Sequence, residues 1–214
     1  MAICKTTSHV EAYRAKARAT DINELSGRTG RPDLTAFVTQ QIVARLPLRR
    51  DAVLVDVGCG DASLLLKAAH HGLDGFLGRL IGLLPTREEV SRVRDHLLHR
   101  APLHSSMVCI EPGLADETRL PDRYCDLLVC NGVLIVLADD ASVRAALTEF
   151  ARITKPGATV YLGEIPDTDE MSGKNYGDSI SGWLLWVLRH QGLRAFWIRL
   201  RQILVAVFSR EPFV

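Results

Sequence analysis

The chain has 214 residues, 47% of them hydrophobic and 24% charged, and a net charge of +1 at pH 7, which is enough material for one sizeable core. It contains no run of about 20 uncharged apolar residues, and its first ten residues lack an apolar stretch, so neither a membrane-spanning helix nor a secretory signal is expected. The central residues 51–170 are acidic, with 11 Lys/Arg against 19 Asp/Glu, which disfavours a nucleic-acid partner. Both flanks are basic: residues 1–50 contain 9 Lys/Arg against 4 Asp/Glu, and residues 171–214 contain 6 against 2.

Residues 1–50 are predicted to form an N-terminal helical cap. A first helix is expected over residues 10–20 and a second over residues 34–46, with Asp33 as its N-cap. The second helix has an apolar stripe at helical spacing, made of Leu34, Phe37, Val38, Ile42, Val43 and Leu46. The basic residues 26–32, between the two helices, are expected to form a loop.

A strand, a glycine turn and a helix follow. Residues 52–55 form a short apolar run typical of a buried parallel strand, and residues 62–71 are expected to be helical. The turn contains two acids and two glycines that let the backbone turn tightly and approach a ligand: Asp56, Gly58, Gly60 and Asp61. Because carboxylates repel the pyrophosphate of a dinucleotide, this turn suits a ligand that carries cationic groups.

The next segments alternate between strand and helix. A second strand is expected over residues 79–84, and Thr86 with Glu89 has the spacing of a capping box that opens a helix through residue 99. A third short apolar run, residues 106–110, predicts another strand. The order of these elements is typical of a parallel sheet with crossover helices.

Two further strands complete the predicted sheet. The fourth is expected over residues 124–131, followed by a helix over residues 141–153 that Asp140 caps. The Pro-Gly pair at residues 156–157 is expected to stop this helix and reverse the chain into a fifth strand over residues 159–163.

In this order, the segments resemble the class I S-adenosylmethionine-dependent methyltransferases over about residues 51–164. Four features carry the resemblance. The first two are the acid and glycine turn of residues 56–62 and the acid Asp116, four residues before Leu-Pro. The other two are the fourth strand, with Asp126 near its start and Asn131 at its end, and the sequence Arg-Ile-Thr-Lys-Pro-Gly at residues 152–157. The resemblance implies an α/β fold with a doubly wound Rossmann-like sheet and flanking helices. It also implies S-adenosylmethionine as cofactor, bound by Asp56, Gly58, Gly60, Asp61, Asp116 and Asn131.

Two positions depart from the family pattern. The third glycine of the turn is replaced by Ala62. In the family, the second strand usually ends in an acid that binds both ribose hydroxyls, whereas Pro85 and Thr86 follow the strand here. Glu88 could reach back to the ribose, although helix capping or solvation also explains the glutamates of this helix.

Residues 165–214 are expected to form an apolar and basic helical segment. Residues 180–208 combine three tryptophans with arginines, a mixture also found at the headgroup depth of membranes. The segment is interpreted as a lid over the acceptor, with peripheral membrane contact or a homodimer interface as the alternatives. The family normally adds a hairpin of a sixth and a seventh strand after the fifth, and its apparent lack indicates a shortened variant or a fragment.

No metal site is expected. His96 and His99 lie at helical spacing but lack a third ligand. Four of the five cysteines lie on or beside predicted core strands without paired metal spacing; the five are Cys4, Cys59, Cys109, Cys125 and Cys130. They are expected to be buried free thiols in a reducing, cytoplasmic compartment.

The resemblance implies methyl transfer, an in-line displacement for which the protein mainly supplies alignment. The acceptor is expected to be a small molecule that is methylated on oxygen: a sugar, a polysaccharide precursor or a secondary metabolite. Asn131 is not followed by the Pro-Pro-Tyr that accompanies amino-group methylation of bases or glutamine in this superfamily. Glu164, directly after the fifth strand, is the candidate for acceptor contact. The alternative is a catalytically degenerate homologue that acts as a binding or scaffold partner.

Overall fold

The computed structural model describes residues 22, 25, 28, 32–49, 51–71, 78–100, 107–137 and 139–165, together with eleven separate positions between residues 181 and 201. The chain divides into two units, Met1–Ile165 and Pro166–Val214. The predicted helix over residues 10–20 lies outside the described residues, and so does most of the predicted lid or interface segment. Among the residues that are described, no helix is long and apolar enough to cross a bilayer.

The first unit contains a five-stranded parallel sheet in the order β3-β2-β1-β4-β5. The strands are β1 (Val53–Val57), β2 (Arg79–Leu84), β3 (Val108–Pro112), β4 (Cys125–Asn131) and β5 (Thr154–Gly163). The strand order reverses between β1 and β4, and in such sheets ligands bind beyond the carboxyl ends of the strands at this switch point. The predicted doubly wound α/β fold is therefore confirmed.

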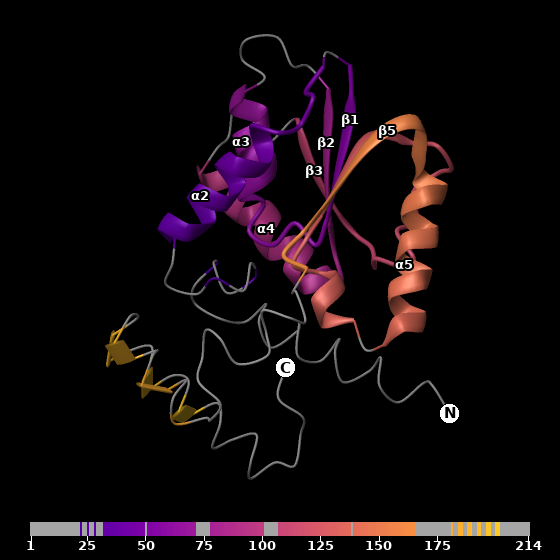
Figure 1. Ribbon diagram of the computed structural model, residues 1–214. Helices are drawn as coiled ribbons and strands as arrows, with labels where there is room; N and C mark the ends of the chain where they lie inside the picture. Colours follow the sequence, from indigo (N-terminus) through magenta and orange to yellow (C-terminus); the bar gives the residue numbers. More distant parts are fainter. Residues whose placement is uncertain are drawn as a thin grey trace. The chain divides into compact units, whose positions relative to one another are not determined.

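Helices cover both faces of the sheet. Figure 1 shows α2 (Pro32–Val43), α3 (Ser63–His71) and α4 (Arg87–Arg100) on one side, and α5 (Asp140–Ile153) on the other. Side chains alternate between the faces along each strand, so that Leu54 packs in the cluster beneath α2, α3 and α4, and its neighbour Val55 packs in the cluster beneath α5. Burial on both faces explains why β1 is a continuous apolar run interrupted only by Asp56.

The structure corrects the predicted start of two helices. The N-cap of α5 is Asp139 rather than Asp140, since the Oδ1 atom of Asp139 accepts a hydrogen bond of 2.9 Å from the backbone N–H of Ser142. Helix α2 begins at Pro32, so Asp33 lies in its first turn and is not its cap. Proline suits this first position because its missing N–H would have no partner within the helix.

The buried face of α2 also differs from the predicted stripe. Leu34 and Phe37 are exposed, and the buried residues of the helix are Thr35, Thr39, Ile42 and Val43. Packing against α3 has selected a face that is rotated by about one residue from the most apolar one. Three of these side chains, Thr35, Thr39 and Ile42, line the pocket described below.

The boundaries of two strands also differ from the predicted ones. The third strand is Val108–Pro112, two residues later than predicted, and β5 begins at Thr154 directly after α5. Between the pairs Cys125↔Thr154 and Leu127↔Thr159 the register shifts, so the Pro-Gly pair forms an irregularity within β5 rather than the end of the helix. Pro156 is tolerated there because it does not pair with β4.

Three of the four described cysteines are buried free thiols, as predicted: Cys59, Cys125 and Cys130. Cys109 is exposed, which corrects the prediction for that residue. Its side chain points to the face of β3 opposite to Val108 and Ile110, which pack in the cluster beneath α4, and β3 is the terminal strand of the sheet.

Candidate functional site

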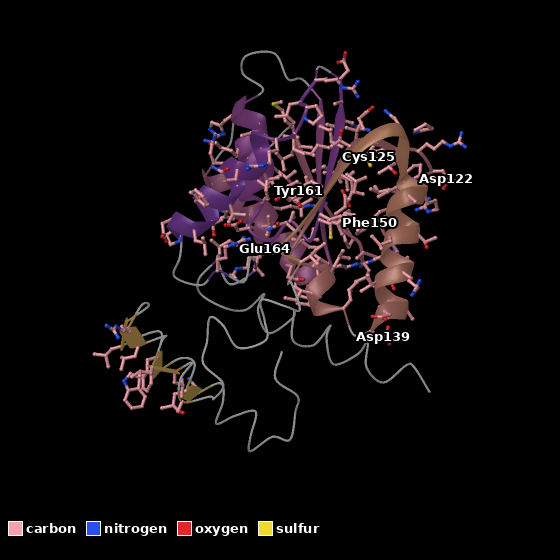
Figure 2. All side chains as sticks on the ribbon, viewed as in Figure 1. Asp122, Cys125, Asp139, Phe150, Tyr161 and Glu164 are labelled. Atoms are coloured by element: carbon pink, nitrogen blue, oxygen red, sulfur yellow. The ribbon has the colours of Figure 1, made fainter. Side chains whose placement is uncertain are left out.

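A pocket of about 620 Å³ opens at the carboxyl ends of the strands, next to the point where the strand order reverses. Its walls come from α2, from the glycine turn after β1, from the ends of β2 and β4, from the loop after β3 and from the start of α5. Figure 2 shows Glu164 and Asp139 at this end of the sheet, and Cys125 at the opposite end. All seven residues predicted for the site line this one pocket: Asp56, Gly58, Gly60, Asp61, Asp116, Asn131 and Glu164.

The glycine turn is held to the end of β2. The backbone N–H groups of Gly58 and Cys59 donate to the carbonyl oxygen of Leu83 at 2.9 and 3.2 Å. Gly58 and Gly60 have positive φ angles of +75° and +55°, which glycine adopts without strain. Ala62, at the position of the third glycine of the pattern, also has a positive φ, +61°, a conformation that is strained for alanine.

Asp56, on β1, is one of three buried carboxylates that line the pocket, together with Asp61 and Glu89. Only 4% of its surface is exposed. Burial, together with the nearby charge of Asp61, raises its pKa from 3.8 to about 7, and the charge of Arg28 opposes this rise. A cation placed beside Asp56 would relieve the repulsion between the two acids.

Asp61 has a second, structural role. Its two carboxylate oxygens accept hydrogen bonds from the backbone N–H and the hydroxyl of Ser63, at 3.1 and 2.8 Å, at the start of α3. These bonds fix the carboxylate at the pocket wall. The glycine turn and the helix start are thus oriented by the same side chain.

The first turn of α4 contributes a pocket residue that was not among the predicted site residues. Glu89 is buried and lines the pocket beside Leu84 and Pro85. It forms the predicted capping box with Thr86: the Oγ1 atom of Thr86 accepts from the N–H of Glu89 at 3.2 Å and donates to the Oε2 atom of Glu89 at 2.8 Å. Glu88, the predicted alternative for the ribose, is exposed and does not line the pocket.

The loop that carries Asp116 is fastened to α5. The Oε1 atom of Glu149 accepts from the N–H and the hydroxyl of Thr118 at 2.9 and 2.5 Å, and Glu149 also pairs with Arg152 at 2.7 Å. Arg152 continues the network to the carbonyl oxygen of Leu120 at 2.8 Å. These bonds hold the pKa of Glu149 at about 2, below its usual 4.5.

We expect Glu149→Gln to lower the free energy of unfolding by about 1–3 kcal/mol at pH 7, because hydrogen bonds to a charged group are replaced by neutral ones. The folded-state pKa is depressed, so this stabilisation is complete above about pH 4.5 and is lost as the pH falls toward 2. Urea unfolding at pH 7 and pH 3 measures both effects. Glu117→Gln, at an exposed ion pair with Arg119, is the control and should change little. A pH-independent difference for Glu149→Gln would contradict the role given to its charge.

The far end of the pocket contains an ion pair between Arg28 and Glu164. Arg28 comes from the segment before α2, and Glu164 follows β5 with a positive φ of +53°. Gly132 allows this approach, since a Cβ atom there would lie 2.6 Å from the Oε2 atom of Glu164. The sequence analysis placed Arg28 only within a basic loop, and no local pattern in the sequence connects it with Glu164.

Acidic side chains are numerous around the pocket, but the structure does not arrange them for a metal. Within the part of the chain that is described, no three His, Cys, Asp or Glu residues form a group that could hold an ion.

The fold and the pocket define a class of protein: a Rossmann-like domain whose acidic switch-point pocket suits a nucleoside ligand with cationic groups. Residues 55–162, half of the chain, match the family model described as "Methyltransferase domain". The chain belongs to this family, the class I S-adenosylmethionine-dependent methyltransferases, and the predicted cofactor S-adenosylmethionine is confirmed. The residues present fit this cofactor, because Asp56 and Asp61 repel one another in the pocket, and a ligand with amino and sulfonium cations would offset that repulsion.

Solved structures support the fold. A putative S-adenosylmethionine-dependent methyltransferase from Methanococcus maripaludis is 21% identical, with a TM-score of 0.56 over 81% of this chain and 71% of that one. Phosphoethanolamine N-methyltransferase 1 from Haemonchus contortus, solved with phosphoethanolamine and S-adenosylhomocysteine, is 16% identical, with a TM-score of 0.59 over 72% and 31%. The [4+2]-cyclase SpnF is 22% identical, with a TM-score of 0.53 over 64% and 47%.

These identities are low enough that the likenesses establish the fold alone. The chain spans about half the length of several structures that it matches, 49%, 55% and 47% of three of them. No functionally curated protein matches the chain significantly.

Proposed function

We propose that the protein is an active methyltransferase that transfers the methyl group of S-adenosylmethionine to an oxygen of a small molecule, such as a sugar, a polysaccharide precursor or a secondary metabolite. The observation that carries this proposal is the single pocket of about 620 Å³, which joins the glycine turn to Glu164. A pocket of this size accommodates a small acceptor beside the cofactor better than a macromolecular one.

The residues that line the pocket differ in character. The end beside β1 presents Asp56 and Asp61, which suit the cofactor. Apolar side chains that follow β4, Val133, Val136 and Leu137, also line the pocket, as does Glu164. An acceptor with an apolar body and a hydroxyl group matches these side chains.

Each side chain then has a defined task. S-adenosylmethionine supplies a methyl group bound to a sulfonium. When the cofactor is bound, the acceptor oxygen would bond to the methyl carbon as the carbon–sulfur bond breaks, and the electron pair of that bond would remain on sulfur. Glu164 accepts a hydrogen bond from the acceptor hydroxyl and takes its proton, and the apolar side chains exclude water that would compete for the methyl group.

The test is a transfer assay with methyl-labelled S-adenosylmethionine and a panel of hydroxyl compounds. We expect at least one compound to stimulate formation of S-adenosylhomocysteine. With that compound, Glu164→Gln should lower kcat about tenfold or more, a larger factor than its effect on the affinity for S-adenosylhomocysteine.

Glu111→Gln is the matched control, because Glu111 is also 45% exposed and pairs with an arginine, but lies outside the pocket. Equal kcat values for the wild type and Glu164→Gln would remove Glu164 from the mechanism. Binding of S-adenosylhomocysteine without transfer to any compound would favour a second candidate, a degenerate homologue that binds the cofactor as a partner or scaffold. The absence of an acid directly after β2 motivates that candidate.

A further inference from the structure

Arg28 differs from the other charged residues of the pocket wall. Among the lining residues that the structure describes, it is the one basic side chain, against six carboxylates: Asp56, Asp61, Glu89, Asp116, Asp139 and Glu164. Its side chain is 14% exposed, compared with 66% for Arg119, whose ion pair with Glu117 lies on the surface. A guanidinium that is this deeply buried needs anionic partners that offset its desolvation.

Glu164 alone does not account for this position. Its carboxylate is 45% exposed, and ion pairs with such a water-exposed partner typically contribute about 0–1 kcal/mol. Arg28 also acts beyond Glu164, since its charge opposes the raised pKa of Asp56 at the end of β1. The guanidinium thus lies between the end of β5 and the end of β1, within the electrostatic reach of both carboxylates.

The cofactor carries three charged groups, and the acids account for two of them. Its amino group and its sulfonium are cations that suit Asp56 and Asp61. Its α-carboxylate is an anion, which the six acids of the wall would repel. A planar guanidinium binds a carboxylate through two parallel hydrogen bonds, and its five N–H donors allow it to bind a second carboxylate at the same time.

We propose that Arg28 binds the α-carboxylate of S-adenosylmethionine, while Glu164 holds its guanidinium from the other side. The segment before α2 is then part of the cofactor site. The inference depends on cofactor binding, which the proposed function also requires, but not on the identity of the acceptor.

The test compares two ligands that differ in the group concerned. S-adenosylhomocysteine has the amino-acid part, whereas 5′-methylthioadenosine has the adenosine and the sulfur without it. Calorimetry should show that Arg28→Gln weakens S-adenosylhomocysteine about 10- to 100-fold and changes 5′-methylthioadenosine less than twofold. Arg28→Lys should recover part of the lost affinity, because lysine restores the positive charge but not the two parallel N–H donors of the guanidinium.

Arg45→Gln is the control. The Arg45 side chain, just after α2, bonds to Gln41 and lies outside the pocket, so this variant should bind both ligands as the wild type does. Equal losses for the two ligands would show that Arg28 supports the pocket structurally and would overturn the proposal. No loss for either ligand, with a raised KM for an anionic acceptor, would overturn it in favour of acceptor recognition. If the wild type itself does not bind S-adenosylhomocysteine, the proposed function fails as well.

Discussion

Replacing Asp56 with Asn should make the ligand-free protein more stable at pH 8 and, in the same variant, remove most of its affinity for the cofactor. Asp56 is buried beside Asp61, and its pKa is about 7 in the folded protein against 3.8 for an unperturbed aspartate. The folded state therefore keeps a proton that the unfolded state releases. The free energy of unfolding falls as the pH rises from about 4 to about 7 and is constant above that range.

The expected change in the free energy of unfolding follows from the pKa shift of Asp56. Each pKa unit corresponds to 1.36 kcal/mol, so ionised Asp56 costs the folded state on the order of 4 kcal/mol above pH 7. Asn has the same shape without the charge, and Asp56→Asn should recover roughly 2–4 kcal/mol at pH 8 but almost nothing at pH 4. Urea unfolding of both proteins at the two pH values measures this difference.

Asp126→Asn is the matched control, with the opposite sign. Asp126 lies on the adjacent strand, and its hydrogen bonds with Lys155 and the N–H of Val53 lower its pKa. Its replacement should therefore decrease stability at pH 8. If Asp56→Asn showed no gain at pH 8 relative to pH 4, the carboxylate would not be under the repulsion inferred here.

The same variant tests the ligand site. A cation beside Asp56 favours the ionised carboxylate, so binding releases a proton and the affinity of the wild type for S-adenosylhomocysteine should rise as the pH increases from 6 to 8. Asp56→Asn should bind about 10- to 100-fold more weakly at pH 8 and lose this pH dependence. Calorimetry in two buffers with different ionisation enthalpies would count the released proton.

Gly58→Ala should have the second large effect, because it adds a Cβ atom where Val133 already lies. The Cβ would overlap the Cγ2 atom of Val133, and the φ of +75° is unfavourable for alanine. We expect a loss of about 2–4 kcal/mol in the free energy of unfolding, together with loss of cofactor binding as the turn shifts. Urea unfolding and calorimetry measure the two losses.

Two variants separate the contact from the backbone strain. Gly157→Ala has a similar φ of +79° but no atom within 4 Å of the added Cβ, so it should lose only about 1 kcal/mol. Combining Gly58→Ala with Val133→Ala removes the overlapping atom and should restore part of the stability relative to the sum of the single variants. Equal losses in Gly58→Ala and Gly157→Ala would show that the overlap is relieved without cost.

The strands and their order were predictable where local patterns agree with the fold. The strand over residues 79–84 was predicted to the residue, because an apolar run there ends at Pro85 and a capping box follows. The α5 cap was misplaced by one residue, since Asp139 and Asp140 are adjacent and only the hydrogen bond to Ser142 distinguishes them. Such ambiguities affect element boundaries and leave the topology unchanged.

Features that depend on tertiary packing could not be predicted from the sequence. The exposure of Phe37 depends on which face of α2 meets α3, and helical spacing alone does not select between neighbouring faces. The glycine turn and its acids were found because they lie within one short segment. Arg28 and Glu89 were not found, because Arg28 meets its partner across 136 residues of chain and Glu89 is explained equally well as a cap.

The pairing of Arg28 with Glu164 has a consequence for how the protein is made. All five strands lie between these two residues, which are separated by 136 positions in the chain. At translation rates of about 5–20 residues per second, Arg28 leaves the ribosome roughly 7–27 s before its partner. During synthesis, the part of the pocket that contains this ion pair is thus completed only after all five described strands have emerged. If Arg28 binds the cofactor as proposed, a nascent domain gains that part of its affinity for the cofactor only after β5 has been translated.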